Sequence, residues 1–268
     1  MSRPIRFAIC LVVAVIFVLP LYAMVVVAFT PRELVFDGGA GLWPQRWTTT
    51  NFRDLFTAFP VWRWFSNAVL VATVTTALSV TVNLAAGFAL AKLQFVGRTA
   101  VLLVVLSTLM VPAQAVMIPQ FELVAKMGLI GFFWAVILPS ASTALGVFLA
   151  RQFFVSVPDE LLDAARLDGC GTWTMLRLVV LPLARPLIAV MVLLAFMTQW
   201  NEFLWPLITL RDPDLYTLPV ALRFLQGQFD TDYGGLMAMA LLSCVPLLVV
   251  FAALQRYFVA GFSRSGIR

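Results

Sequence analysis

Two groups of polar side chains lie inside long apolar runs of this sequence, and they are the groups that could contact a polar solute. The first group carries hydroxyls and a carboxamide, and the second, in the motif QWNEFLWP, carries two carboxamides and a carboxylate. The candidate solute-path residues are Thr76, Ser79, Asn83, Gln199, Asn201 and Glu202. Hydroxyl, amide and carboxylate groups hydrogen-bond to the hydroxyls of a solute.

Each group also has a structural interpretation. A spacing of three or four residues puts Thr76, Ser79, Asn83 and Gly87 on one face of a helix, and small or hydroxylated residues are common where membrane helices pack. Glu202 lies about two turns from the end of its apolar run, where it could reach water. The spacing leaves packing and cavity lining open for the first group, and solute contact and structural hydrogen bonding open for the second.

The elements that position these residues are expected to be membrane-spanning helices. The chain has 268 residues and is 62% hydrophobic, whereas a soluble domain is about 45–50% apolar. A helix needs about 20 apolar residues to cross a bilayer. Pro20, Pro112, Pro139 and Pro246 predict kinks within four of the six stretches of that length. These stretches are 7–29, 65–90, 100–118, 131–150, 186–208 and 236–258. We expect an all-α polytopic membrane protein with six transmembrane helices in a single domain, 1–268.

Charges differ between the loops. Eleven of the 18 Lys and Arg residues fall in alternate loops counted from the N-terminus, and most of the acids fall in the other loops. The positive-inside rule then places both termini in the cytoplasm. The first apolar run is too long for the core of a signal peptide, so we expect a retained helix. The net charge of +5 reflects this topology, and no basic patch predicts a nucleic-acid partner.

Enzymatic chemistry has little support. The sequence contains no histidine, which is the usual base for a Ser or Cys nucleophile. Neither Lys92 nor Lys126 lies in a GxxxxGK[ST] phosphate-binding loop. Cys10, Cys170 and Cys244 are isolated and lack metal-ligand spacing. We therefore expect no catalytic residue, cofactor site or metal site on this chain, which leaves transport, insertion or a structural role.

The loop between the fourth and fifth expected spans predicts a helix-turn-helix. In SVPDELLDAARLDG, Ser156 and Asp159 match a capping box, and Gly169 suits the left-handed residue that ends a helix. A second helix is expected from Thr172, as its N-cap, to Pro182. The densest group of charges in the chain therefore lies on a short cytoplasmic helix.

This first helix, in the loop 152–185, is both acidic and apolar. Its charged side is expected to carry Asp159, Glu160, Asp163 and Arg166. Its apolar contact area is expected to come from Leu161, Leu162, Ala165 and Leu167. Ala164 and Ala165 would let a partner surface approach closely. Helices that bind lipid surfaces are usually basic, so this helix fits a protein groove better.

The same loop resembles the cytoplasmic signature of permease subunits of bacterial ABC importers. That signature reads Glu-Ala-Ala, three residues, Gly, nine residues, Ile, one residue and Leu-Pro. The matching positions are Asp163, Ala164, Ala165, Gly169, Val179, Leu181 and Pro182. Two positions depart from it, with Asp in place of Glu and Val in place of Ile.

Further motifs narrow the resemblance to the carbohydrate uptake family. RWFSNAVLVA, GFALAKLQFVGR, QWNEFLWPLI and YTLPVALRFLQG resemble the second inner-membrane permease of binding-protein-dependent importers of the maltose-transport type. The resemblance covers about 47–268. It implies a coupling function, through contact with an ATPase, for Asp159, Glu160, Asp163, Ala164, Ala165, Asp168, Gly169, Leu181 and Pro182.

The resemblance also implies the location, in the inner or plasma membrane of a bacterial cell, and the partners. It predicts a sister permease subunit, two ATPase subunits that hold ATP and Mg²⁺, an external solute-binding protein and a sugar-like solute. Close alternatives for the solute are glycerol phosphate-type compounds and amino sugars. Two rival classes remain: a secondary carrier or channel, which would show inverted repeats or titratable groups in the membrane, and a membrane scaffold that does not transport.

Overall fold

The computed structural model describes residues 3–36, 43–226 and 232–265 of the chain. Every regular element in these three segments is helical, and they contain no β-strand. The expected all-α class is therefore confirmed.

The chain forms two compact units. Unit 1 comprises residues 1–66 and 217–247, and unit 2 comprises residues 67–216 and 248–268. The candidate solute-path residues and the loop 152–185 all belong to unit 2.

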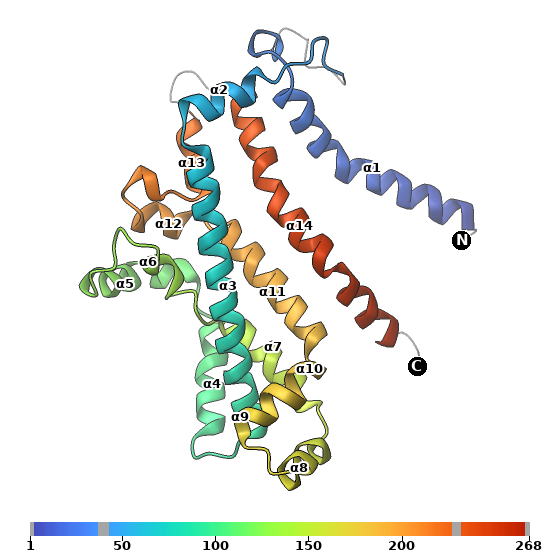
Figure 1. The fold of residues 1–268 in the computed structure, drawn as a ribbon, viewed down its shortest axis with the longest axis vertical. Helices are drawn as coiled ribbons and strands as arrows, with labels where there is room; N and C mark the ends of the chain where they lie inside the picture. The colour runs from blue at the N-terminus through green and yellow to red at the C-terminus, as the bar shows by residue number, and fades with distance from the viewer. Residues whose placement is uncertain (1–2, 37–42, 227–231, 266–268) are drawn as a thin grey trace. The chain divides into compact units, whose positions relative to one another are not determined.

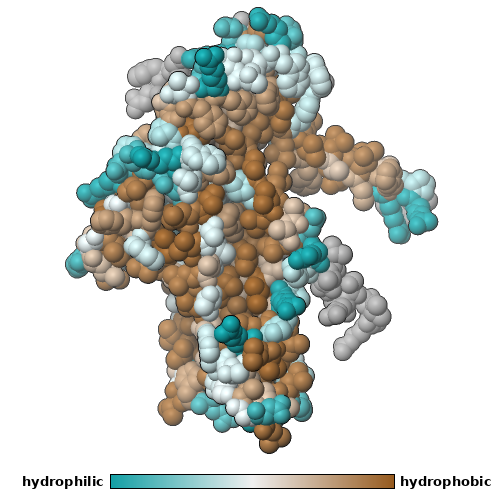
Figure 2. Space-filling model, in the orientation of Figure 1, coloured by the Kyte–Doolittle hydropathy of each residue, from teal (hydrophilic) through white to brown (hydrophobic). Residues whose placement is uncertain are grey.

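Unit 1 contains the N-terminal helix. Its elements are α1 (Arg3–Ala28), η1 (Arg32–Leu34), α2 (Thr50–Ala58), α13 (Leu218–Leu225) and the first turns of α3 (Val61–Lys92) and α14 (Tyr233–Ser265). The buried Asn51 donates from Nδ2 to the carbonyl oxygens of Ala28 and Thr30, at 2.8 Å each, which fastens α2 to the end of α1. In α1 itself only Val26 and Ala28 are buried, and Figure 2 shows the helix as hydrophobic over most of its length and hydrophilic at its N-terminal end.

Unit 2 contains the rest of α3, the part of α14 from Leu248 onward and a series of shorter helices (Figure 1). They are α4 (Arg98–Thr108), α5 (Ala113–Lys126), α6 (Trp134–Ile137), α7 (Ala144–Val155), α8 (Asp159–Leu167), α9 (Thr172–Met175), the π-helical turn η2 (Leu176–Val180), α10 (Leu181–Leu183), α11 (Arg185–Trp200), α12 (Leu204–Thr209) and η3 (Pro213–Leu215). Trp205 on α12 donates from Nε1 to the carbonyl oxygen of Ala135 on α6 at 2.9 Å, which joins these two short helices.

Three helices in the described part of the chain are long and apolar enough to cross a membrane. They are α1, α3 and the segment Tyr233–Tyr257 of α14. Two further pairs meet the same criteria together but are sharply bent: α4 with α5, by 106°, and Thr172–Leu183 with α11, by 84°. The structure therefore gives three to five apolar spans, and the expected number of six stays a prediction.

Three of the expected spans are not single helices, which corrects the sequence analysis. The stretch 186–208 leaves the helical conformation at residues 201–203, between α11 and α12. The stretch 100–118 contains the bend between α4 and α5, where Pro112 has extended backbone angles and is the N-cap of α5. The stretch 131–150 leaves the helical conformation between α6 and α7, at Pro139 and its neighbours. Proline lacks a backbone donor and disfavours the α conformation in the residue before it, so the kinks expected at Pro112 and Pro139 are complete breaks. Pro20 and Pro246 lie inside the continuous helices α1 and α14.

The core of unit 2 joins α3 and α7 to the elements that follow. Phe88 on α3 packs edge-to-face against Phe154 on α7, with ring centroids 5.8 Å apart. A Cβ at Gly87 would lie 2.4 Å from Cβ of Ala150, so glycine is needed for this close approach. For Gly87, the packing interpretation of the polar stripe is the one the structure supports.

Candidate functional site

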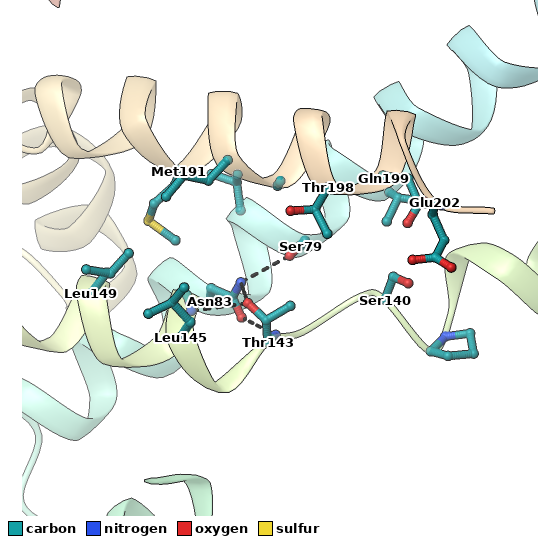
Figure 3. A pocket seen from close by; sticks show the side chains of 16 residues that line it. Ser79, Asn83, Ser140, Thr143, Leu145, Leu149, Met191, Thr198, Gln199 and Glu202 are labelled. Carbon is teal, nitrogen blue, oxygen red and sulfur yellow. Dashed lines mark hydrogen bonds between the residues drawn. The ribbon is translucent and has the colours of Figure 1, made fainter. Parts of the chain in front are cut away.

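A cavity of about 380 Å³ in unit 2 collects four of the six candidate solute-path residues (Figure 3). We call it the polar pocket; its walls come from α3, from residues 139–149 and from α11. The four candidates that line it are Ser79, Asn83, Gln199 and Glu202. In Figure 3, Glu202 and Ser140 lie near one end of the pocket, and Leu149 and Met191 lie near the other. Its volume is within the range of about 300–1,000 Å³ typical of small-molecule sites.

The other two candidates, Thr76 and Asn201, do not line the polar pocket. Thr75 lines it in place of Thr76, because consecutive residues of a helix point about 100° apart. Asn201 is exposed, and its Nδ2 donates to the carbonyl oxygen of Met197 at 2.7 Å. The expectation that these two face a solute therefore has no support from the pocket.

Besides Thr75, three hydroxyl residues line the pocket without having been candidates: Ser140, Thr143 and Thr198. The first two follow Pro139 in the break between α6 and α7, where the chain is not helical. A helical periodicity could not find them. The available signal was the cluster of small hydroxyl residues in PSAST directly after a proline.

Asn83 is the centre of a hydrogen-bond network that holds the pocket together. Its Nδ2 donates to Oγ of Ser79 at 3.1 Å, and its Oδ1 accepts from Oγ of Ser142 at 2.9 Å and from the backbone N of Thr143 at 3.1 Å. Oγ1 of Thr143 accepts from the backbone N of Gly146 at 3.1 Å and so caps α7. Asn83 thus ties α3 to the start of α7, and it both lines the pocket and stabilises it.

Two other lining residues have unused hydrogen-bonding capacity. Gln199 and Thr75 are 8% and 3% exposed, and neither Nε2 of Gln199 nor Oγ1 of Thr75 has a hydrogen-bond partner within the described part of the chain. Glu202 is half-buried, and its Oε1 accepts from the backbone N of Trp205 at 3.2 Å, at the start of α12.

In the loop 152–185 the structure has α8, a break at residues 168–171 and a second helical stretch that begins with α9. The caps of these helices differ from the expected ones. Pro158, not Ser156, is the N-cap of α8, and Oγ of Ser156 donates to the carbonyl oxygen of Phe153, so the predicted capping box is wrong. The C-terminal end is as expected, because Gly169 has φ +82°. The backbone N atoms of Gly169 and Cys170 donate back to carbonyl oxygens of α8, at 3.0 and 2.9 Å, as in a Schellman motif.

The second helix of the loop starts at Thr172, but its N-cap is Gly171. It continues through η2 into α10, where Leu181 packs on the core of unit 2 and Pro182 is exposed. The loop is therefore continuous with α11, which carries one wall of the polar pocket.

The two faces of α8 differ in a way that corrects the expected contact area. Leu162 and Ala165 are buried in the core of unit 2, at 2% and 6% exposure, so they pack against their own chain. Leu167 is 90% exposed, and Trp173 on α9 is 65% exposed. The outward-facing candidates are Asp159, Glu160, Asp163, Ala164 and Asp168. The sequence analysis did not include Trp173, which extends this exposed surface beyond α8.

Lys92, the last residue of α3, fastens that helix to the start of α8. Its side chain is 7% exposed, and its Nζ donates to the carbonyl oxygen of Val157 and to Oδ1 of Asp159, at 2.6 Å each. The hydrogen bond from Lys92, together with its positive charge, lowers the pKa of Asp159 below its usual value.

Replacing Lys92 with methionine is expected to loosen α8. Removing a buried charge-assisted hydrogen bond costs about 1.4 kcal/mol or more, so amide hydrogen exchange in residues 159–168 should be about tenfold faster. Asp159→Asn is the matched control, and it should have a smaller effect because Asp159 is exposed and exposed ion pairs contribute little. Equal protection in wild type and Lys92→Met would show that Lys92 does not hold α8.

The pH dependence of this protection follows from the lowered pKa of Asp159. A depressed folded-state pKa gives stability that is present above the unfolded value, about 3.9, and is lost as the pH falls through the folded value. Exchange in α8, corrected for its intrinsic pH dependence, is therefore expected to be constant from about pH 8 to pH 5 and to rise only below about pH 4. A rise near neutral pH would contradict the pairing.

Comparisons with known proteins fit this geometry. Residues 83–264 match the family of the binding-protein-dependent transport system inner membrane component. The arabinooligosaccharides transport system permease protein of Halalkalibacterium halodurans is 38% identical, over 96% of this chain and 93% of the relative. The sn-glycerol-3-phosphate transport system permease protein of Shigella flexneri is 30% identical, over 90% and 89%. The fold is similar to a chain of a bacterial ABC transporter that imports the acidic polysaccharide alginate, with a TM-score of 0.86, 22% identity and coverage of 96% and 99%.

Proposed function

Because this chain belongs to the family of binding-protein-dependent transport system inner membrane components, we propose that it is the permease subunit of an ATP-driven importer for a sugar or oligosaccharide. The observation that carries the proposal is α8. Its inner face packs into the core of unit 2, while its outer face exposes carboxylates beside Leu167. An exposed acidic and apolar helix that is firmly attached to its own chain suits docking into a protein groove.

The proposed topology has six spans in one permease domain over 1–268, with both termini and the coupling loop 152–185 in the cytoplasm. The three long helices and the bent pair of α4 with α5 support four of these spans. For a fifth we propose α11, whose bent partner Thr172–Leu183 belongs to the coupling loop. For the remaining span we propose the broken segment from α6 to α7, since α7 is apolar but only 12 residues long. The excess of Lys and Arg in alternate loops supports the orientation.

The proposed partners are those of a binding-protein-dependent importer. A sister permease completes the translocation path, two ATPase subunits dock on the coupling loops, and an external solute-binding protein delivers the solute. ATP and Mg²⁺ belong to the ATPase subunits, since this chain has no phosphate-binding loop. The exposed apolar surface of α1 provides area for contact with lipid or with the sister subunit.

Two physical connections support coupling between α8 and the polar pocket. Lys92 joins α8 to α3, which carries Ser79 and Asn83 at the pocket. The helix-turn-helix also continues through α10 into α11, which carries Gln199 and other lining residues. A displacement of α8 when the ATPases close around ATP would therefore move two walls of the pocket. ATP shifts the permease between outward-open and inward-open states because it binds those states differently through the ATPases.

The energy source of uptake tests the function. We expect proteoliposomes containing the complex, its binding protein and internal ATP to accumulate a radiolabelled sugar, and to do so equally when ion gradients are dissipated. Uptake that needs an ion gradient and not ATP would favour a secondary carrier. A complex that assembles but moves no solute would favour a scaffold.

A further inference from the structure

The polar pocket offers hydrogen bonds on every wall but carries a single charge. Five hydroxyls, two carboxamides and one carboxylate line it, and its other lining residues are glycine or apolar, with no Lys or Arg among them. The five hydroxyl residues are Thr75, Ser79, Ser140, Thr143 and Thr198. Apolar side chains, including Leu149 and Met191, complete the lining. This mixture suits a solute that has both hydroxyl groups and C–H faces.

The hydrogen bonds of each polar lining group show whether it stabilises the wall of the pocket or is available to bind a solute. The amide of Asn83 is fully engaged with Ser79, Ser142 and Thr143. In contrast, Nε2 of Gln199 and Oγ1 of Thr75 have no partner in the described structure, although both side chains are more than nine-tenths buried. A buried donor left unpaired is costly, so these two atoms are the ones that a solute hydroxyl would satisfy.

The single charge in the pocket, the carboxylate of Glu202, affects which solutes can bind there. Glu202 is held in place by the hydrogen bond from the backbone N of Trp205, and no cation among the lining residues offsets it. A fixed carboxylate repels another anion within a few ångströms, and the effect is strong where water is partly excluded. A carboxylate or phosphate group on a solute would therefore be disfavoured in this pocket.

We propose that the polar pocket is a solute-contact site within this subunit for an uncharged polyhydroxy compound, and that Glu202 excludes anionic solutes. Gln199 and Thr75 supply the hydrogen bonds to the solute. This inference rests on the proposed function, and it specifies which subunit contacts the solute and which class of solute passes. It predicts a neutral oligosaccharide rather than a glycerol phosphate or an acidic polysaccharide.

The local charge can be measured without knowing the solute. Thr198 is exposed to the pocket and lies one turn from Glu202. The variant Thr198→Cys is made in the intact complex, with Cys10, Cys170 and Cys244 of this chain replaced by serine. Its cysteine is reacted separately with two reagents, the cationic trimethylammonium-ethyl methanethiosulfonate and the anionic sulfonatoethyl methanethiosulfonate. After each rate is divided by that of the same reagent with 2-mercaptoethanol, we expect the cationic reagent to be favoured about tenfold.

Glu202→Gln separates the charge from the structural hydrogen bond, because a glutamine oxygen can still accept from Trp205. We expect this second substitution to bring the normalised ratio of the two rates to within about twofold of unity. A purely structural function of Glu202 would leave the ratio unchanged. A ratio near unity already in Thr198→Cys alone, or one unaffected by Glu202→Gln, would overturn the assignment of Glu202.

Solute contact is tested by protection of the same cysteine. The probes are the neutral trisaccharides maltotriose, raffinose and arabinotriose, and the anionic trigalacturonate, each at about 10 mM, which favours detection of weak sites. We expect at least one neutral probe to slow labelling of Thr198→Cys about threefold or more, and trigalacturonate to have no effect. If no neutral probe protects, or if trigalacturonate protects equally, the pocket is not the proposed site. A complex whose ATP turnover still responds to solute would then retain the proposed function while this inference fails.

Discussion

Arginine at position 164 is expected to prevent ATPase binding in a folded chain, whereas arginine at position 165 is expected to prevent folding. The two alanines are adjacent, but Ala164 is exposed on α8 and Ala165 is 6% exposed in the core of unit 2. A long side chain at Ala164 blocks close approach of a partner. The same side chain at Ala165 must bury its charge against residues such as Phe154, which costs several kcal/mol.

Both variants can be compared by size-exclusion chromatography in mild detergent and by the amount of ATPase that co-purifies. For Ala164→Arg we expect a monodisperse chain with at least about tenfold less ATPase, equivalent to a loss of about 1.4 kcal/mol or more of binding energy. For Ala165→Arg we expect aggregation or degradation. Normal ATPase recovery with Ala164→Arg would remove the outer face of α8 from the interface.

The substitution Gly146→Ala is expected to destabilise unit 2 more than a substitution of any exposed residue does. A Cβ there would lie 2.2 Å from Nδ2 and 2.7 Å from Cγ of Asn83, and 2.8 Å from Oγ1 of Thr143. Those atoms belong to the network that joins α3 to α7, so they cannot move without breaking its hydrogen bonds. Overpacking together with lost buried hydrogen bonds costs about 2–4 kcal/mol.

The measurement is the thermal unfolding midpoint of the purified chain. For Gly146→Ala we expect a decrease of about 5–10 °C, given about 2–4 °C per kcal/mol for a chain of this size. Gly171→Ala is the matched control, because a Cβ at Gly171 meets no atom within 4 Å and its φ of −69° is ordinary. An equal midpoint for both variants would mean that the α3–α7 contact adapts to the methyl group.

The helical elements were largely predictable because their signals are local. The apolar run of α3 and the turn at Gly169 depend on residue types and spacing alone, and both were predicted correctly. The breaks at Pro112 and Pro139 were expected only as kinks. Whether a proline bends or ends a membrane helix depends on whether neighbouring helices satisfy the freed backbone groups. The sequence alone does not contain this information about tertiary contacts.

The site was predicted in part, for a similar reason. Gln199 and Glu202 were found because polar groups in an apolar run are conspicuous. The sequence could not distinguish Thr75 from Thr76 as a lining residue, because the absolute rotation of a helix follows from tertiary packing. Ala165 was expected to face a partner because small residues favour close contact. The structure shows that the close contact is with its own chain. Periodicity identifies a face but not the surface that it meets.

The most direct test of the account is ATP hydrolysis by the material that co-purifies natively with this chain, measured with its binding protein across a panel of neutral sugars and glycerol phosphodiesters. We expect an ATPase in the complex whose turnover rises several-fold with one neutral saccharide and its binding protein, and stays basal with the phosphodiesters. Absence of any co-purifying ATPase under mild conditions would contradict the docking of α8 and the assignment of this chain as an importer permease.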